Sequence, residues 1–338
     1  MRYVSRTFCF MLIMIVLSTV PGCDRLNVEV SSRTVPVPQY SLARDQTHNK
    51  FSRTIPPVLR VPSGAVVEAF TQEATDGQLT VQSTSADVPN VAFDPIHPLT
   101  GPVYVEGAEP GDVLKVTLHD VEIGDWGWSG VFPGFGFLAD EFTEPYLKTF
   151  ELGKNAASVQ FSDRINIPLR PFAGVMGVAP DTDELLSTIP PRANGGNMDN
   201  PDLVAGTIVY FPVFVPGALF SLGDTHAAQG LGEVCGTGIE APMRIVYQVD
   251  VLKGQKHIKE PQYETEAYYA VSAFAASIDT AAKNATRYMV DYLEFEHGME
   301  RTEAYVLCSL AADLRIVEVV DVPNMHVAMR ISKKLLGM

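Results

Sequence analysis

Residues 113–121 read VLKVTLHDV, in which apolar and polar side chains alternate. A period of two predicts a β-strand with one buried face. Similar runs occur at 58–61, 65–70 and 78–82, with Pro-Ser-Gly and Asp-Gly turn signals between them. Together with 26 glycines and 24 prolines, these runs predict a β-rich region over residues 46–262, built as a sandwich or barrel.

The C-terminal portion, residues 263–338, has a different pattern. Residues 272–293 carry apolar side chains at helical spacing and many alanines, which predicts a helix. A second helix is expected at 302–312 and a strand at 314–320. The predicted fold class is therefore mainly β, sandwich-like or barrel-like, with an α+β C-terminal portion.

The first 23 residues have the layout of a secretory signal: two arginines, an apolar run at 8–17 and a small-residue end at Cys23. The Gly-Cys ending resembles the lipobox of bacterial lipoproteins, which predicts diacylation of Cys23, export to the cell envelope and anchoring at the membrane. A cleaved soluble product and a retained anchor are the alternatives. Residues 24–45 are polar and predict a tether.

Composition excludes some functions. A formal charge of -15 argues against non-specific nucleic-acid binding, because phosphates would be repelled. The four cysteines form no C-x-x-C pair, and no nucleophile elbow, H-E-x-x-H or Walker loop occurs.

The best pointer to chemistry is LGDTHAAQGLGEVCGTGIEAPM, residues 222–243, which holds Asp224, His226, Glu233 and Glu240. Carboxylate and imidazole together are the usual ligands of a hydrolytic divalent metal. In an extended segment Asp224 and His226 point to the same face, so they can share a ligand. The alternative is that Asp224 caps a turn and His226 is structural.

Three other segments are candidates. NGGNMDN, residues 194–200, offers Asn197 and Asp199 as oxygen ligands or an amide clamp, or as ordinary turn residues. Residues 125–140 alternate glycine with aromatics, including Trp126 and Phe135, and predict either a pocket wall or a packed hairpin. His48, at the start of the folded region, is the third candidate, and the alternative is that it lies in a surface loop.

Several long blocks of this sequence resemble the acetamidase/formamidase family. They are TGPVYVEGAEPGDVLKV (100–116), GGNMDN (195–200) and GALFSLGDTHAAQGLGEVCGTGIE (217–240), supported by residues 48–57, 174–180 and 302–305. The likeness covers about residues 46–335, so the β-rich region is expected to be amidase-like.

The resemblance implies an oligomeric, metal-dependent hydrolase that cleaves the C–N bond of small linear amides and releases ammonia. Zinc is the expected ion, with calcium or magnesium as alternatives. Glu240, or Glu233 if it is not a ligand, would move the proton from water to the leaving nitrogen. The implied metal ligands are Asp199, Asp224, His226 and Glu233, and the expected substrate contacts are Asn197, His48, Trp126 and Phe135.

One departure is Leu231, which stands where the family commonly has an aspartate and removes a carboxylate beside the expected site. Leu231 puts activity in question, and the aromatic-rich segment 125–140 could shape a larger pocket, so two rival functions stay open. One is a lipid-anchored, non-catalytic binding protein with the same fold, and the other is a hydrolase of a larger or cyclic amide.

Overall fold

The computed structural model describes residues 34–338 except 155 and 256. The predicted signal segment, Cys23 and residues 24–33 of the predicted tether lie outside the described residues. Residues Val35–Met338 form one compact unit. Within the described part of the chain, every helix is too short or too polar to cross a membrane.

The larger of two main sheets has nine strands and includes the strand predicted at 113–121. Its longest contact joins β7 and β17, which are antiparallel over ten residues of β17. In spatial order the strands are β1 (Tyr40–Leu42), β5 (Ala65–Phe70), β17 (Met243–Leu252), β7 (Val113–Ile123), β15 (Ile208–Pro212), β18 (Gln262–Glu264), β19 (Tyr268–Ala275), β21 (Met325–Ser332) and β20 (Ala312–Glu318).

The second main sheet has six strands and carries the candidate ligands. Its order is β14 (Gly195–Asn197), β12 (Phe172–Gly177), β16 (Phe220–His226), β6 (Leu99–Val105) and β2 (Thr47–His48), with β4 (Leu59–Val61) also paired to β6. Three small ladders complete the β structure: β8 (Trp126–Val131) with β9 (Tyr146–Glu151), β10 (Ser158–Ser162) with β11 (Ile165–Pro168), and β3 (Lys50–Phe51) with β13 (Leu186–Ser187).

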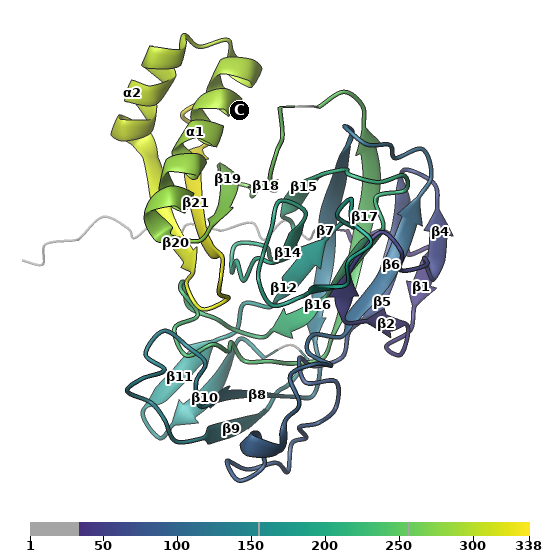
Figure 1. Ribbon diagram of the computed structural model, residues 1–338, viewed down its shortest axis with the longest axis vertical. Coiled ribbons are helices and arrows are strands. Elements are labelled where there is room, and N and C mark those ends of the chain that lie inside the picture. Colours follow the sequence, from purple (N-terminus) through teal and green to yellow (C-terminus); the bar gives the residue numbers. More distant parts are fainter. Residues whose placement is uncertain (1–33, 155, 256) are drawn as a thin grey trace, which may run out of the picture. The chain divides into compact units, whose positions relative to one another are not determined.

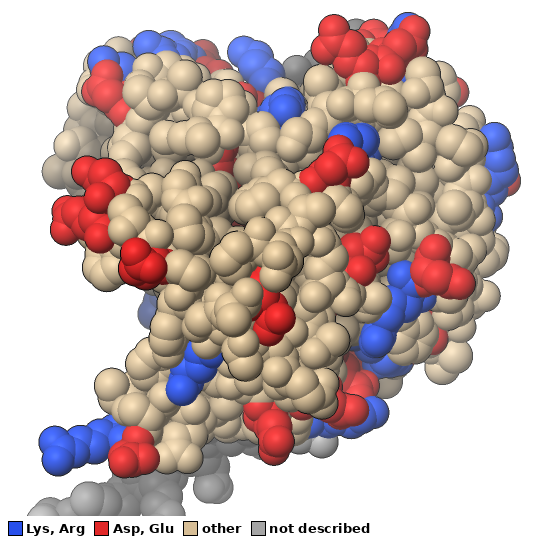
Figure 2. All heavy atoms as spheres, turned by 60° about the horizontal axis from the view of Figure 1, so that its bottom comes forward, with Lys and Arg blue, Asp and Glu red and all other residues tan. Residues whose placement is uncertain are grey.

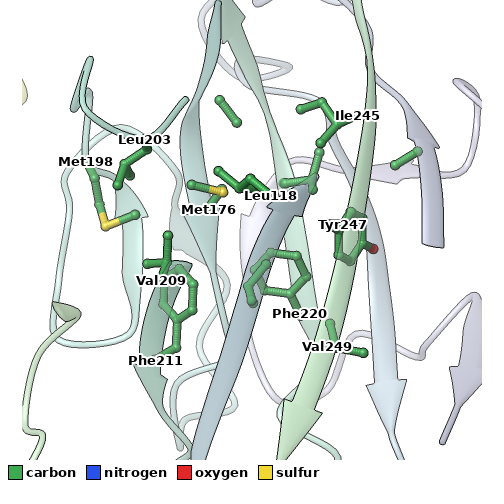
Figure 3. Packing of buried hydrophobic residues seen from close by; sticks show 14 of the residues in the cluster. Leu118, Met176, Met198, Leu203, Val209, Phe211, Phe220, Ile245, Tyr247 and Val249 are labelled. Atoms are coloured by element: carbon green, nitrogen blue, oxygen red, sulfur yellow. The ribbon is translucent and has the colours of Figure 1, made fainter. Parts of the chain in front are cut away.

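The two main sheets pack face to face around one apolar core, as in a β-sandwich (Figure 3). Leu118 on β7 and Tyr247 on β17 point from the nine-stranded sheet toward Met176 on β12 and Phe220 on β16. The Phe220 and Tyr247 rings lie 5.4 Å apart between centroids. The predicted mainly β class is therefore confirmed.

Two helices, α1 (Ile278–His297) and α2 (Arg301–Ala311), cover the end of the nine-stranded sheet formed by β19, β21 and β20 (Figure 1). Ser277 caps α1 by accepting a hydrogen bond from the Thr280 backbone N–H, and Gly298 ends it with a left-handed φ of 63°. The only short 3₁₀ segment in the described residues is Val88–Asn90.

Three expectations about local structure were wrong. Residues 272–275 belong to β19 rather than to the predicted helix, because they pair with Met325–Ala328 on β21 and tertiary pairing overrides helical propensity. Residues 78–82 form turns, with Leu79 buried under them. The predicted tether over 24–45 ends too late, since β1 pairs with β5 and Leu42 is buried.

The core gives a first prediction. Leu118 is 1% exposed between the sheets, so Leu118→Ala leaves a cavity and lowers the free energy of unfolding by about 2–5 kcal/mol. Leu310→Ala is the matched control, because Leu310 is 79% exposed on α2 and its loss changes stability by less than about 0.5 kcal/mol. Urea unfolding measures both; equal losses would contradict the assigned core.

Candidate active site

The centre of the candidate site is the end of β16, which lies between β12 and β6 in the six-stranded sheet. Asp224 and His226 occur at the last positions of this strand, and both are buried. His226 Nε2 lies 3.5 Å from Asp224 Oδ2. The imidazole and the carboxylate therefore lie side by side, as expected, although Asp224 has a left-handed φ of 48° and departs from regular strand geometry.

Three further carboxylates approach the two nitrogens of the same imidazole. Glu240 Oε2 lies 3.0 Å from His226 Nε2, on the side of Asp224. On the other side, Asp199 Oδ1 and Glu233 Oε1 lie 3.6 Å and 4.0 Å from His226 Nδ1. We call these five residues the His226 cluster. The structure therefore brings together every metal-ligand and catalytic residue that the sequence suggested.

The backbone of the His226 cluster is strained. Asp199, Asp224 and Glu233 have φ angles of 41°, 48° and 47°, in the left-handed region that side chains rarely adopt. Each such conformation costs about 1–3 kcal/mol and persists only where surrounding contacts impose it. The cluster is also tight at Gly174 on β12, where a Cβ would lie 2.4 Å from Asp199 Oδ1. Only glycine fits there.

Burial of like charges dominates the electrostatics. Burial raises the pKa of Glu240 to about 8 and the pKa of Asp199 to about 6, and it raises the pKa of Glu233 well above its usual value. Burial alone would lower the pKa of His226, but the Glu240 and Asp224 carboxylates raise it instead. These groups cannot all ionise in an apolar interior without a compensating cation.

The donor set fits a divalent cation. Gln229 Nε2 donates to the Asp199 carbonyl (2.8 Å), and this orients Gln229 Oε1 toward His226 Nδ1 at 2.6 Å. Because a carbonyl oxygen only accepts, Nδ1 carries the proton and Nε2 faces Asp224 and Glu240. Within the described residues, His226 Nε2 and Glu240 Oε2 have no aligned hydrogen-bond partner although they are buried. An ion is the natural partner of such atoms.

A small cavity of about 40 Å³ opens beside the cluster. Its polar side is formed by Asn197, Asp224, Glu233, Glu240 and Asp321, and its apolar side includes Phe93, Ile96, Trp128, Phe132 and Phe135. The acidic groups of the site are interior, whereas acidic and basic side chains are interspersed on the outer face in Figure 2. The segment 125–140 thus supplies both core and pocket wall.

Not all expected contacts reach the cavity. Asn197 and Phe135 line it, but Trp126 does not; Trp128, two residues later, takes that place and donates its Nε1–H to Glu73 Oε2 at 2.8 Å. His48 instead bridges Lys50 O and Ser221 Oγ, each at 2.7 Å. Its role here is to join β2 to β16.

Leu231 differs from the His226 cluster in burial. Its side chain is 40% exposed, in contrast to the buried carboxylates of the cluster. The adjacent Gly232 N–H donates to Val317 O on β20. An aspartate at 231 would therefore be a partly exposed group rather than an extra buried ligand.

The sequence interpretation missed three polar residues at or next to the cavity. His97 lines the cavity, and its Nε2 lies 3.7 Å from Asp224 Oδ1. Asp321 reaches the same cavity from the turn between β20 and β21, next to buried Glu318. No local motif marks these positions, and Asp321 is about a hundred residues from the cluster in sequence, so only the fold could bring it there.

Known proteins share this fold and much of this sequence. The chain is similar to an acetamidase from Mycolicibacterium smegmatis, with 30% identity over 62% of this chain and 68% of that protein. It is also similar to the solved structure of a predicted acetamidase/formamidase from Thermoanaerobacter tengcongensis, with 32% identity, a TM-score of 0.83, and coverage of 88% and 97% of the two chains. A gamma lactamase from Delftia acidovorans matches at 26% identity and a TM-score of 0.64, covering 87% and 93%.

The fold and site define a β-sandwich protein with a buried carboxylate and imidazole centre. The model of the Acetamidase/Formamidase family matches residues 37–187 and 182–336. The chain belongs to this family, and the resemblance drawn from its sequence is confirmed.

The burial of His48 gives a prediction on acid stability. Burial lowers the pKa of His48 to about 4, below the unfolded value, so its neutral form is favoured in the folded state. The contribution of His48 to the free energy of unfolding is therefore fully present above about pH 6.5 and is lost as the pH falls toward 4.

Urea unfolding at pH 7.5 and 4.5 tests this prediction. Between these two pH values, the free energy of unfolding should fall by about 2–3 kcal/mol more in the wild type than in His48→Gln. Equal acid losses in the two proteins would show that His48 is not a source of acid sensitivity.

Proposed function

We propose that this protein is a metal-dependent hydrolase that cleaves small linear amides of the formamide and acetamide type to a carboxylate and ammonia. The single observation that carries the proposal is the convergence of Asp224, His226 and Glu240, whose ligand atoms lie within 4.8 Å of one another, beside a cavity that Asp224 and Glu240 line. The coarser class, a hydrolase of C–N bonds in linear amides, follows from relatives named acetamidase and formamidase and confirms the class expected from the sequence.

The size of the cavity supports a small substrate. A cavity of about 40 Å³ is only a few times the volume of about 10–15 Å³ that one water needs, which favours a small substrate. Formamide and acetamide have three and four non-hydrogen atoms. The likeness to a gamma lactamase favours a cyclic amide as a second candidate, but the cavity volume supports the smaller linear substrates.

The cation would be held by Asp224, His226 and Glu240, whose ligand atoms lie within 4.8 Å of one another. Within the described residues, Asp199 and Glu233 form a second possible group with His226, but they face Nδ1, which Gln229 already engages. This ligand set differs from the one that the resemblance implied. We propose zinc because of the imidazole ligand; when bound, such an ion supplies a Lewis acid for the amide carbonyl and promotes ionisation of water.

Glu233 would then be the proton carrier. It lines the cavity but lies on the Nδ1 side of His226, away from the proposed ligand set. Its carboxylate would accept a proton from the attacking water and deliver it to the leaving nitrogen, so that ammonia can depart. The apolar wall formed by Trp128, Phe132 and Phe135 excludes bulk water and strengthens the interactions of these charges. Export, anchoring through Cys23 and homo-oligomer formation stay predictions from the sequence.

Activity of the purified, zinc-loaded protein tests the proposed function. The wild type should release ammonia from formamide and acetamide, and Glu233→Gln should lower kcat by about 10²–10⁴-fold because the proton carrier is lost. His226→Ala should also abolish turnover, whereas Leu310→Ala should not. If the wild type released no ammonia from any amide, the non-catalytic binding function would be favoured instead.

Metal affinity provides a separate test. Gln229 orients the imidazole through Nδ1, so Gln229→Leu should weaken zinc binding by about 10–100-fold. Competition with a chelating dye measures the dissociation constant, again with Leu310→Ala as control. An unchanged constant would mean that the Gln229 side chain does not set the orientation of His226.

A further inference from the structure

Asn197, at the end of β14, has an unusual arrangement of hydrogen bonds. Its side chain is buried and lines the cavity. Asn197 Nδ2 donates to Asp321 Oδ2 at 2.7 Å. Its other polar atom, Oδ1, is buried and has no hydrogen-bond partner in the part of the chain that the structure describes. A buried carbonyl without a donor is costly, so this atom calls for an N–H or O–H from a ligand.

Asp321 is held firmly in the turn between β20 and β21. Glu318 Oε1 accepts a hydrogen bond from the Asp321 backbone N–H at 2.6 Å and a second from Val320 N–H. Farther along the turn, Asn324 Nδ2 donates to Pro191 O at 2.9 Å, next to the segment that leads into β14. On β21, His326 Nδ1 bonds to Met198 O at 2.7 Å. The C-terminal turn is thus attached to the chain on both sides of Asn197.

These contacts give the Asn197 amide one orientation. The acceptor at Asp321 Oδ2 takes the NH₂ end, which leaves the carbonyl end for the ligand. An amide substrate carries N–H donors on its nitrogen, whereas an ester of the same acyl group has none. A site built to bond a substrate N–H discriminates strongly against an analogue that lacks it.

We propose that Asp321 is a positioning residue that orients Asn197, so that Asn197 Oδ1 accepts an N–H of the substrate and the pair selects amides over esters. This inference rests on the proposed amide hydrolase function. It assigns a role in substrate selection to the C-terminal portion, through a residue that does not belong to the His226 cluster.

Hydrolysis of acetamide and methyl acetate by the zinc-loaded protein tests the inference. Asp321→Leu should lower the ratio of kcat/KM for acetamide to kcat/KM for methyl acetate by about 10–100-fold, because only the amide loses a hydrogen bond. Asp321→Asn should restore the amide preference, since its side-chain oxygen can still accept from Asn197 Nδ2. If Asp321 had a purely structural role, Asp321→Leu would lower kcat/KM for both substrates equally, and that result would overturn the proposal.

Binding supplies a readout that does not need turnover. Saturation-transfer NMR in the Glu233→Gln background compares acetamide with methyl acetate, after thermal melting shows that each variant is folded. We expect preferential acetamide binding that Asp321→Leu removes and Asp321→Asn retains. Absence of this preference in the Glu233→Gln protein, or its persistence in Asp321→Leu, would overturn the role of Asp321. Absence of ammonia release by the wild type alone would instead count against the proposed function.

Discussion

The structure depends on one constraint: four carboxylates surround a single imidazole in the interior. Their mutual repulsion and loss of hydration oppose folding unless a cation or protons neutralise them. The sandwich meets this constraint by placing His226 on β16, between two neighbouring strands of the six-stranded sheet. Gly174 on the adjacent β12 provides the space that the carboxylates need. The left-handed backbone at three of the acidic residues is a further cost of the same arrangement.

The C-terminal portion is part of this site rather than a separate attachment. β19, β21 and β20 extend the nine-stranded sheet beyond β18, and the two helices cover that extension. The turn after β20 then returns to the segment around β14 and places Asp321 beside Asn197. Residues that are far apart in sequence thereby line one cavity, and the boundary drawn at residue 262 does not separate two chemical roles.

Some parts of the fold were predictable because their signals are local. Alternation of apolar and polar residues identified β7, and glycine-spaced polar residues identified the loop after β16. The start of α1 was misplaced because residues 272–275 are alanine-rich yet satisfy their backbone by pairing with β21. The choice between Trp126 and Trp128 failed for a related reason. The two residues are two positions apart on β8, so their side chains are expected on the same face. Alternation therefore cannot show which ring reaches the cavity.

The sequence alone determines the mainly β class, the family and the identity of the polar residues around His226. These properties depend on short-range periodicity and on contiguous motifs. Only the tertiary structure shows which nitrogen of His226 faces which carboxylates, because the orientation depends on Gln229 and on Asp199, which follows β14. It also brings in His97 and Asp321, whose positions are set by long-range strand pairing and leave no trace in the neighbouring sequence.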